Sequence, residues 1–145
     1  MSQKQFKFEL VVNHSFEHLS LRLKFSGSQA NGIYDLSRPG NSDERHKWKA
    51  VALKSADWKM LCNAVFLARL DELPEAEPEC EWEMLDGAFY TLNIQINERK
   101  FSRTRRVDPE RRFCVVVNKM IDLVPQLDEQ LTPNLNLKDY YKFDV

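Results

Sequence analysis

Glycine and proline are scarce in this chain, and no long apolar run interrupts its charged residues. Four Gly and six Pro among 145 residues, with 30% charged and 43% hydrophobic residues, exclude collagen-like, low-complexity and disordered classes. No window approaches the roughly eighteen apolar residues of a membrane span, and the first residues lack the apolar stretch of a signal peptide. The composition predicts one globular domain over 1–145 that has no membrane partner and is not secreted.

Neither sign of charge dominates, and cysteine is rare. The 21 Lys and Arg nearly balance the 22 Asp and Glu, so the net charge of −1 selects no nucleic acid, anionic membrane or basic substrate. The three cysteines are odd in number and form no CxxC pair, and Cys62 and Cys114 fall within apolar periodic segments. These features favour free thiols in the core and a cytoplasmic location.

Apolar and polar residues alternate in several segments, which is the pattern of half-buried β-strands. Strands are expected at 6–12, 19–25, 33–36, 49–53, 88–96 and 100–107. Helical spacing predicts one helix over 55–70, capped by Ser55, and another over 109–124, capped by Asp108 with Pro109 at its first position. We predict an α+β fold, with an antiparallel sheet of about five or six strands and two main helices packed on one face.

Two segments lack a regular period. Residues 71–86 carry eight acidic residues and two prolines, which predicts an acidic connecting loop. In residues 126–145 the aromatic residues Tyr140, Tyr141 and Phe143 predict a tail that docks on the 1–125 core or pairs with a sheet edge.

No residue pattern predicts a catalytic, cofactor or metal site. The chain has no GxGxxG, no GxSxG and no Gly-rich phosphate loop. His14 and His18 are four residues apart but fall in a predicted loop without further ligands, and flanking glutamates disfavour a reactive thiolate at Cys80. The sequence therefore predicts a protein that is not an enzyme and holds no cofactor and no metal.

Charge is concentrated in two segments of the chain. Seven Lys and Arg fall within 99–112, and five glutamates alternate along 75–83. Guanidinium groups bind carboxylates and phosphates through paired hydrogen bonds, so the arginines suit an acidic partner; they equally suit pairing with the chain's own acidic loop. The candidate partner-binding residues are Arg103, Arg105, Arg106, Arg111, Arg112, Glu75, Glu77, Glu79, Glu81 and Glu83.

Residues 55–124 also show a recurring order of motifs. A capped helix and an acidic loop are followed by Asp86-Gly87 before one strand and Arg106-x-x-Pro109 after the next. This order resembles small uncharacterised bacterial α+β domains in which an Asp-Gly and an Arg-x-x-Pro bracket a hairpin. The resemblance implies that Asp86 and Arg106 lie at the same end of the hairpin and form a structural ion pair.

The separated charged segments and the lack of a catalytic pattern predict a non-catalytic protein-binding module, comparable to small immunity proteins, antitoxins and adaptor subunits. Two alternatives remain open. The arginines of 99–112 suit a nucleic-acid-associated accessory protein, whose binding would weaken steeply with salt. Trp48 and Trp82 suit stacking on a small molecule or carbohydrate.

Overall fold

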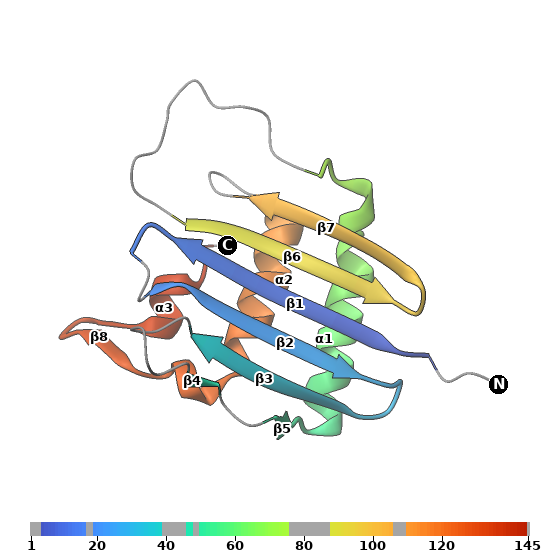
Figure 1. The fold of residues 1–145 in the computed structure, drawn as a ribbon, viewed down its shortest axis with the longest axis horizontal. Helices are drawn as coiled ribbons and strands as arrows, with labels where there is room; N and C mark the ends of the chain where they lie inside the picture. Colours follow the sequence, from blue (N-terminus) through green and yellow to red (C-terminus); the bar gives the residue numbers. More distant parts are fainter. Residues whose placement is uncertain are drawn as a thin grey trace.

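A computed structural model describes residues 4–16, 19–38, 46–47, 50–75, 88–105 and 110–144, with the backbone alone at 46–47. Strands dominate the first half of the chain, and the second half begins with a hairpin that leads into a helix (Figure 1). The elements are β1 (Phe6–His14), β2 (Leu21–Gly27), β3 (Gly32–Arg38), β4 (His46–Lys47), β5 (Val51–Ala52), α1 (Ser55–Ala68), η2 (Leu70–Glu72), β6 (Ala88–Ile96), β7 (Arg99–Arg105), α2 (Arg111–Asp122), η3 (Pro125–Leu127), β8 (Gln130–Thr132), β9 (Leu135–Asn136) and α3 (Leu137–Tyr141).

The main sheet is antiparallel throughout, in the order β4-β3-β2-β1-β6-β7. The short strand β5 pairs with β3 as well, at the same edge as β4. β1 lies at the centre because it pairs with β2 on one side and with β6, from the second half of the chain, on the other. β7 forms the opposite edge of the sheet.

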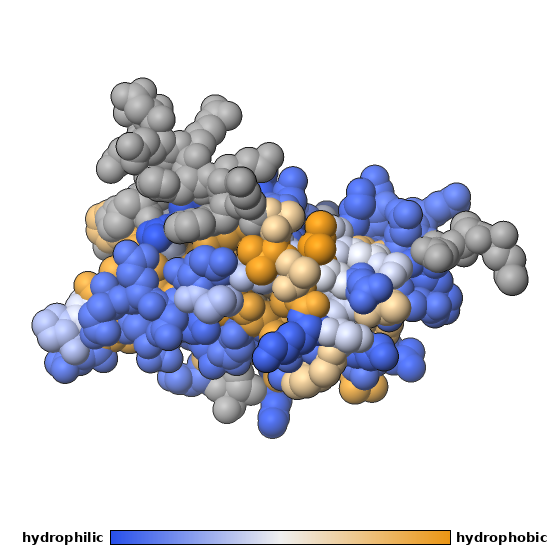
Figure 2. Space-filling model, turned by 90° about the horizontal axis from the view of Figure 1, so that it is seen from below, coloured by the Kyte–Doolittle hydropathy of each residue, from blue (hydrophilic) through white to orange (hydrophobic). Residues whose placement is uncertain are grey.

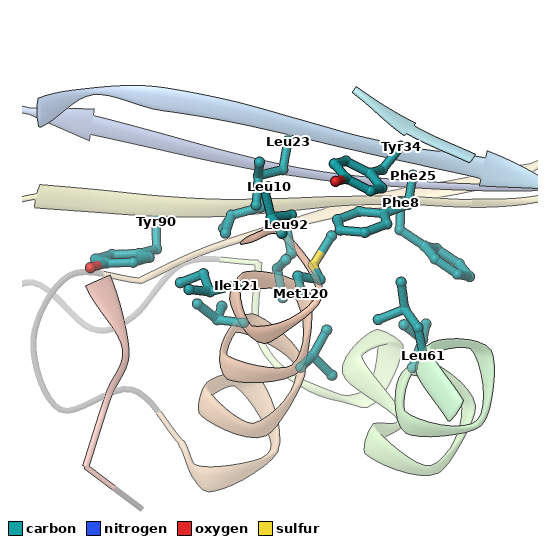
Figure 3. Close-up of a cluster of buried hydrophobic side chains, with 14 of the residues drawn as sticks. Phe8, Leu10, Leu23, Phe25, Tyr34, Leu61, Tyr90, Leu92, Met120 and Ile121 are labelled. Carbon is teal, nitrogen blue, oxygen red and sulfur yellow. The ribbon is translucent and has the colours of Figure 1, made fainter. Parts of the chain in front are cut away.

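Both main helices, α1 and α2, cover the same face of this sheet (Figure 1). Every second residue of β1 is buried on that face, from Phe6 to Val12, so the strict alternation in the sequence sets which face the strand buries. In Figure 3 the side chains of Met120, Ile121 and Leu61 point from the helices toward those of the sheet. This two-layer arrangement confirms the predicted α+β class.

The starts of the helices differ from those predicted. Lys54, and not Ser55, is the N-cap of α1, and the Ser55 hydroxyl donates to the Ala30 carbonyl oxygen at 3.2 Å instead. The second helix begins at Arg111 with Glu110 as N-cap, two residues later than predicted. Neither N-cap side chain forms a hydrogen bond with the helix backbone.

Trp58 anchors α1 to the start of β3. Its ring is fully buried, and its Nε1 donates to the Ser28 carbonyl oxygen at 2.7 Å. The ring lies so close to Gly32 that a Cβ at this position would be 2.2 Å from Trp58 Cδ2. The close approach of ring and strand therefore requires glycine at residue 32.

The end of the chain packs against the rest of the protein. Tyr141 of α3 is fully buried and its hydroxyl donates to the Leu19 carbonyl oxygen, while the Tyr90 hydroxyl donates to the Tyr141 carbonyl oxygen at 2.9 Å. The Asn118 side chain exchanges two hydrogen bonds of 2.8 Å with the backbone of Phe143. This segment, which has no regular period in the sequence, is thus held by buried side chains and by hydrogen bonds to distant elements.

Candidate functional site

Arg103 of the arginine-rich segment joins β7 to η2, the short helix that follows α1. Arg103 lies opposite Leu92 of β6, on the face that the helices cover. Its Nε donates to the Leu70 carbonyl oxygen at 2.9 Å, and its Nη2 donates to that of Asp71 at 3.0 Å. Its Nη1 donates a third hydrogen bond, of 2.7 Å, to the carbonyl oxygen of Ser102 in the same strand.

Arg105 repeats this arrangement two residues further along β7. It is only 3% exposed, and its Nη2 donates to the Pro74 carbonyl oxygen at 2.5 Å. Its Nη1 donates to the carbonyl oxygens of Glu75 at 3.1 Å and Thr104 at 2.7 Å. The guanidinium carbon also lies 6.0 Å from the centre of the Phe113 ring. We call these two arginines, with the carbonyl groups they hold, the arginine clasp.

The arginine clasp closes one edge of the sheet. An edge strand presents carbonyl groups to which another chain could add a strand, and here arginine side chains occupy those of Ser102 and Thr104. The guanidinium groups of Arg103 and Arg105 are therefore bound to the protein's own backbone, beside an ion pair of 2.8 Å between Arg99 and Asp71. Contact of the two clasp arginines with a partner stays a prediction.

The other predicted site residues are distributed differently. Arg112 lies 3.8 Å from Glu72 and 3.5 Å from Glu110, and its Nη1 is 3.4 Å from the Ala68 carbonyl oxygen at the end of α1. Arg111 is exposed, as is Glu75. Outside the described residues lie Arg106, Glu77, Glu79, Glu81, Glu83 and Asp86, and with them the predicted ion pair between Asp86 and Arg106.

An apolar groove lies between α1 and α2, on their solvent side. Leu67 is 81% exposed, Met60 50% and Val115 38%, and together with Ala64 they line a volume of about 470 Å³. We call this surface the α1–α2 groove. The two helices are antiparallel neighbours here, because the first turn of α2 meets the last turn of α1.

The sequence carried a signal for this groove that the predictions missed. The core-facing stripe of α1 is Trp58, Leu61, Cys62, Val65 and Ala68. Large apolar residues off this stripe, above all Met60 and Leu67, leave α1 apolar on its solvent side as well. A helix that is apolar on both sides is usually covered on both sides, so large apolar residues outside the core stripe are the signal in the sequence for this groove.

Positive charge borders the α1–α2 groove on the side of α2. Arg111, Arg112 and Lys119 line it, and Asn63 is the polar residue contributed by α1. Among the described residues, Arg112 pairs with carboxylates, whereas Arg111 and Lys119 form no ion pair. The groove therefore combines an exposed apolar floor with a border of cationic groups, which are chemically suited to bind carboxylates.

The open face of the sheet carries a larger depression of about 550 Å³, but its character is different. Five side chains from neighbouring strands stand in one row across it: Asp35, Lys24, Glu9, Asn93 and Ser102. Asn93 donates to Glu9 at 2.7 Å, Ser102 donates to Asn93 at 2.5 Å, and Lys24 lies 3.9 Å from Glu9. Lys24, Glu9, Asn93 and Ser102 thus bind one another in sequence, so their side chains join β2, β1, β6 and β7 on this face.

A third surface is the edge of the sheet at β3 and β5. Figure 2 shows hydrophobic side chains gathered in the middle of this side of the molecule, with hydrophilic ones around them. Ile33 is 44% exposed there, and Val51 is half-buried.

The remaining candidate groups have structural environments. Burial raises the pKa of the Cys62 thiol to about 11 and also raises the pKa of Cys114, which disfavours a reactive thiolate at either position. The His14 Nε2 lies 2.5 Å from the Tyr140 hydroxyl, and its Nδ1 accepts from the Phe16 backbone at 3.0 Å. Where the structure describes the chain, no three His, Cys, Asp or Glu residues are grouped as a metal site would require.

Comparison with known proteins adds no assignment to this geometry. No protein-family model matches the chain, and no curated protein matches it. Within the described ranges, none of the helices is both long enough and apolar enough to cross a membrane. The α1–α2 groove is thus the candidate site on physical grounds alone.

Proposed function

We propose that this protein is a non-catalytic protein-binding module and that the α1–α2 groove is its binding surface. The observation that carries the proposal is the exposure of Leu67, at 81%, beside Met60, at 50%, on a helix whose other side already lies in the core. Exposed apolar clusters rimmed by polar residues are typical of protein interfaces. Arg111 and Arg112, two of the predicted partner-binding residues, belong to this rim.

The apolar floor and the charged rim have separate roles in this proposal. Burying a leucine side chain contributes about 1.5–3 kcal/mol, so Leu67 and Met60 supply most of the affinity. Arg111 and Lys119 steer a partner that carries carboxylates and reject one that carries ammonium groups. Selectivity by charge and affinity by apolar burial together describe an adaptor or an inhibitor of another protein.

The test compares variants in their capture of proteins from an extract of the source cells. Leu67→Glu places a charge on the groove floor, and Lys59→Glu, on an exposed position of the same helix outside the groove, is the matched control. We expect one stoichiometric protein with the wild type and with Lys59→Glu, retained after nuclease treatment and lost with Leu67→Glu. Equal capture by both variants would refute the assignment of the groove, and loss on nuclease treatment would favour the nucleic-acid alternative.

Cys62 supports a cytoplasmic location as part of the same proposal. It is buried in α1 and is a free cysteine. Free thiols are typical of proteins in reducing compartments.

A further inference from the structure

The apolar floor of the α1–α2 groove has the repeat of a helix-binding surface. Met60, Ala64 and Leu67 stand at positions i, i+4 and i+7 of α1, so they form one stripe along about 10 Å of the helix. Ala64, in the middle, leaves room for a close approach between two large side chains. Grooves of this kind receive amphipathic helices whose apolar residues repeat with the same spacing.

The charges of the groove lie on one side only. Arg111, Arg112 and Lys119 all belong to α2, whereas α1 contributes the apolar stripe and one neutral amide. Arg111 and Lys119 are eight residues apart, which is about 12 Å or two turns along α2. A helix lying in the groove would therefore meet apolar groups along one edge and cations along the other.

A second copy of the same chain does not fit this surface. In a two-fold dimer the same surface of each molecule forms the contact, so two grooves lined by Arg111, Arg112 and Lys119 would bring their like charges together. Among the described residues neither Arg111 nor Lys119 has a carboxylate to offset that repulsion. The occupant must bring negative charge to the α2 side of the groove.

We infer that the groove binds an amphipathic helix of a partner protein, with apolar residues at i, i+4 and i+7 on α1 and with carboxylates along the edge that faces Arg111 and Lys119. This inference rests on the proposed protein-binding function and specifies the element that is recognised. Because the cations lie on one side of the groove only, they also fix the rotation of the bound helix about its long axis. A different rotation would place the carboxylates of the helix on the apolar stripe of α1.

The experiment uses three synthetic peptides of about 20 residues, titrated into the isotope-labelled full chain and followed by NMR. The first carries leucines at the required spacing with glutamates along one edge. The second has lysines in place of those glutamates. The third is the acidic peptide with two central prolines. We expect only the first to bind, with shifts of the amide signals of Leu67, Val115 and Lys119.

Variants of the protein test the contacts. Leu67→Glu is expected to weaken binding of the acidic helix by about 10- to 100-fold, and Arg111→Glu by about 5- to 10-fold at low salt. Lys59→Glu, which changes the charge by the same amount as Arg111→Glu but lies outside the groove, is expected to change binding by less than about 2-fold. Each variant is first compared with the wild type by circular dichroism, so that a folding defect is not read as lost binding.

Three outcomes would overturn the inference: equal binding of the acidic and basic peptides, binding of the proline-containing peptide, or shifts confined to the open face of the sheet. Failure of the acidic peptide, while capture of a cellular partner still depends on Leu67, would refute the helical occupant and leave the protein-binding function standing. If the acidic peptide does not bind and capture of a cellular partner does not depend on Leu67, the helical occupant and the binding function of the groove are both refuted. Dimerisation abolished by Leu67→Glu would replace the partner with a second copy.

Discussion

Removal of the Arg105 guanidinium is expected to destabilise the protein although no partner or substrate is involved. We choose Arg105→Met because methionine keeps the apolar stem of arginine and removes only the donors. Arg105 is 3% exposed and donates to the carbonyl oxygens of Pro74, Glu75 and Thr104 at 2.5, 3.1 and 2.7 Å. All three hydrogen bonds of the clasp residue are lost in this variant.

The magnitude follows from those three bonds. A hydrogen bond from a charged donor contributes about 1.5–3 kcal/mol net. The net loss is smaller than the sum of the three hydrogen bonds for two reasons. The variant has no guanidinium group to desolvate on folding, and carbonyl groups near the surface form hydrogen bonds with water instead. We expect the free energy of unfolding to fall by about 2–4 kcal/mol. Arg105→Lys is expected to lose about 1–2 kcal/mol, since one ammonium group cannot reach three carbonyl groups in the same geometry.

Urea unfolding followed by circular dichroism measures this change directly. Arg111→Met is the matched control, because Arg111 is exposed and forms no ion pair with the described residues; we expect a change within about 0.5 kcal/mol. At about 2–4 °C per kcal/mol, the melting temperature of Arg105→Met should fall by roughly 5–15 °C. If both methionine variants unfold within about 0.5 kcal/mol of each other, the clasp contributes no stability and the reasoning fails.

Three further predictions concern the fold. Gly32→Ala is expected to cost about 1–3 kcal/mol in urea unfolding, because the new Cβ would lie 2.2 Å from Trp58 Cδ2; an unchanged midpoint would contradict that contact. Arg69 ends α1 with a left-handed φ of 48°, so Arg69→Gly should raise the free energy of unfolding by about 0.5–1 kcal/mol, and a loss would show that its side chain matters more. Burial raises the pKa of Cys62 to about 11 and that of Tyr141 to about 12 from ordinary values of 9.0 and 10.0. The unfolded chain therefore releases these protons first, so the urea midpoint should hold below about pH 9 and fall between pH 9 and 12; a constant midpoint up to pH 12 would contradict the burial of both groups.

The sequence was most informative where one face of an element is buried along its whole length. The period of two at Phe6, Phe8 and Leu10 predicts a strand and its buried face together, because successive side chains of a strand point to opposite sides. The apolar spacing of 111–122 predicts α2 in the same way. The segment 126–145 gives no such signal, since its short elements are held by contacts such as those of Tyr141 and Asn118 with distant residues.

The candidate site was predictable only in part. Arg111 and Arg112 were selected for their charge, and they do border the α1–α2 groove. Leu67 and Met60 were passed over, because one sequence does not reveal which side of an apolar helix the sheet covers. Likewise, the density of arginine in 99–112 indicated side chains that bind oxygen atoms. It did not reveal that Arg103 and Arg105 bind backbone carbonyl oxygens of the same chain, about thirty residues earlier.

Local periodicity was enough to predict the fold class, the buried faces of the strands and the core stripes of the helices, because folding removes the periodic apolar side chains from water. Three features came to light only in the folded molecule: α1 keeps a second apolar side in solvent, α2 borders that side with cations, and two arginines close the edge of β7. Those features depend on which distant segments become neighbours, and hydrogen bonds or grooves between neighbours form only after the layers have packed.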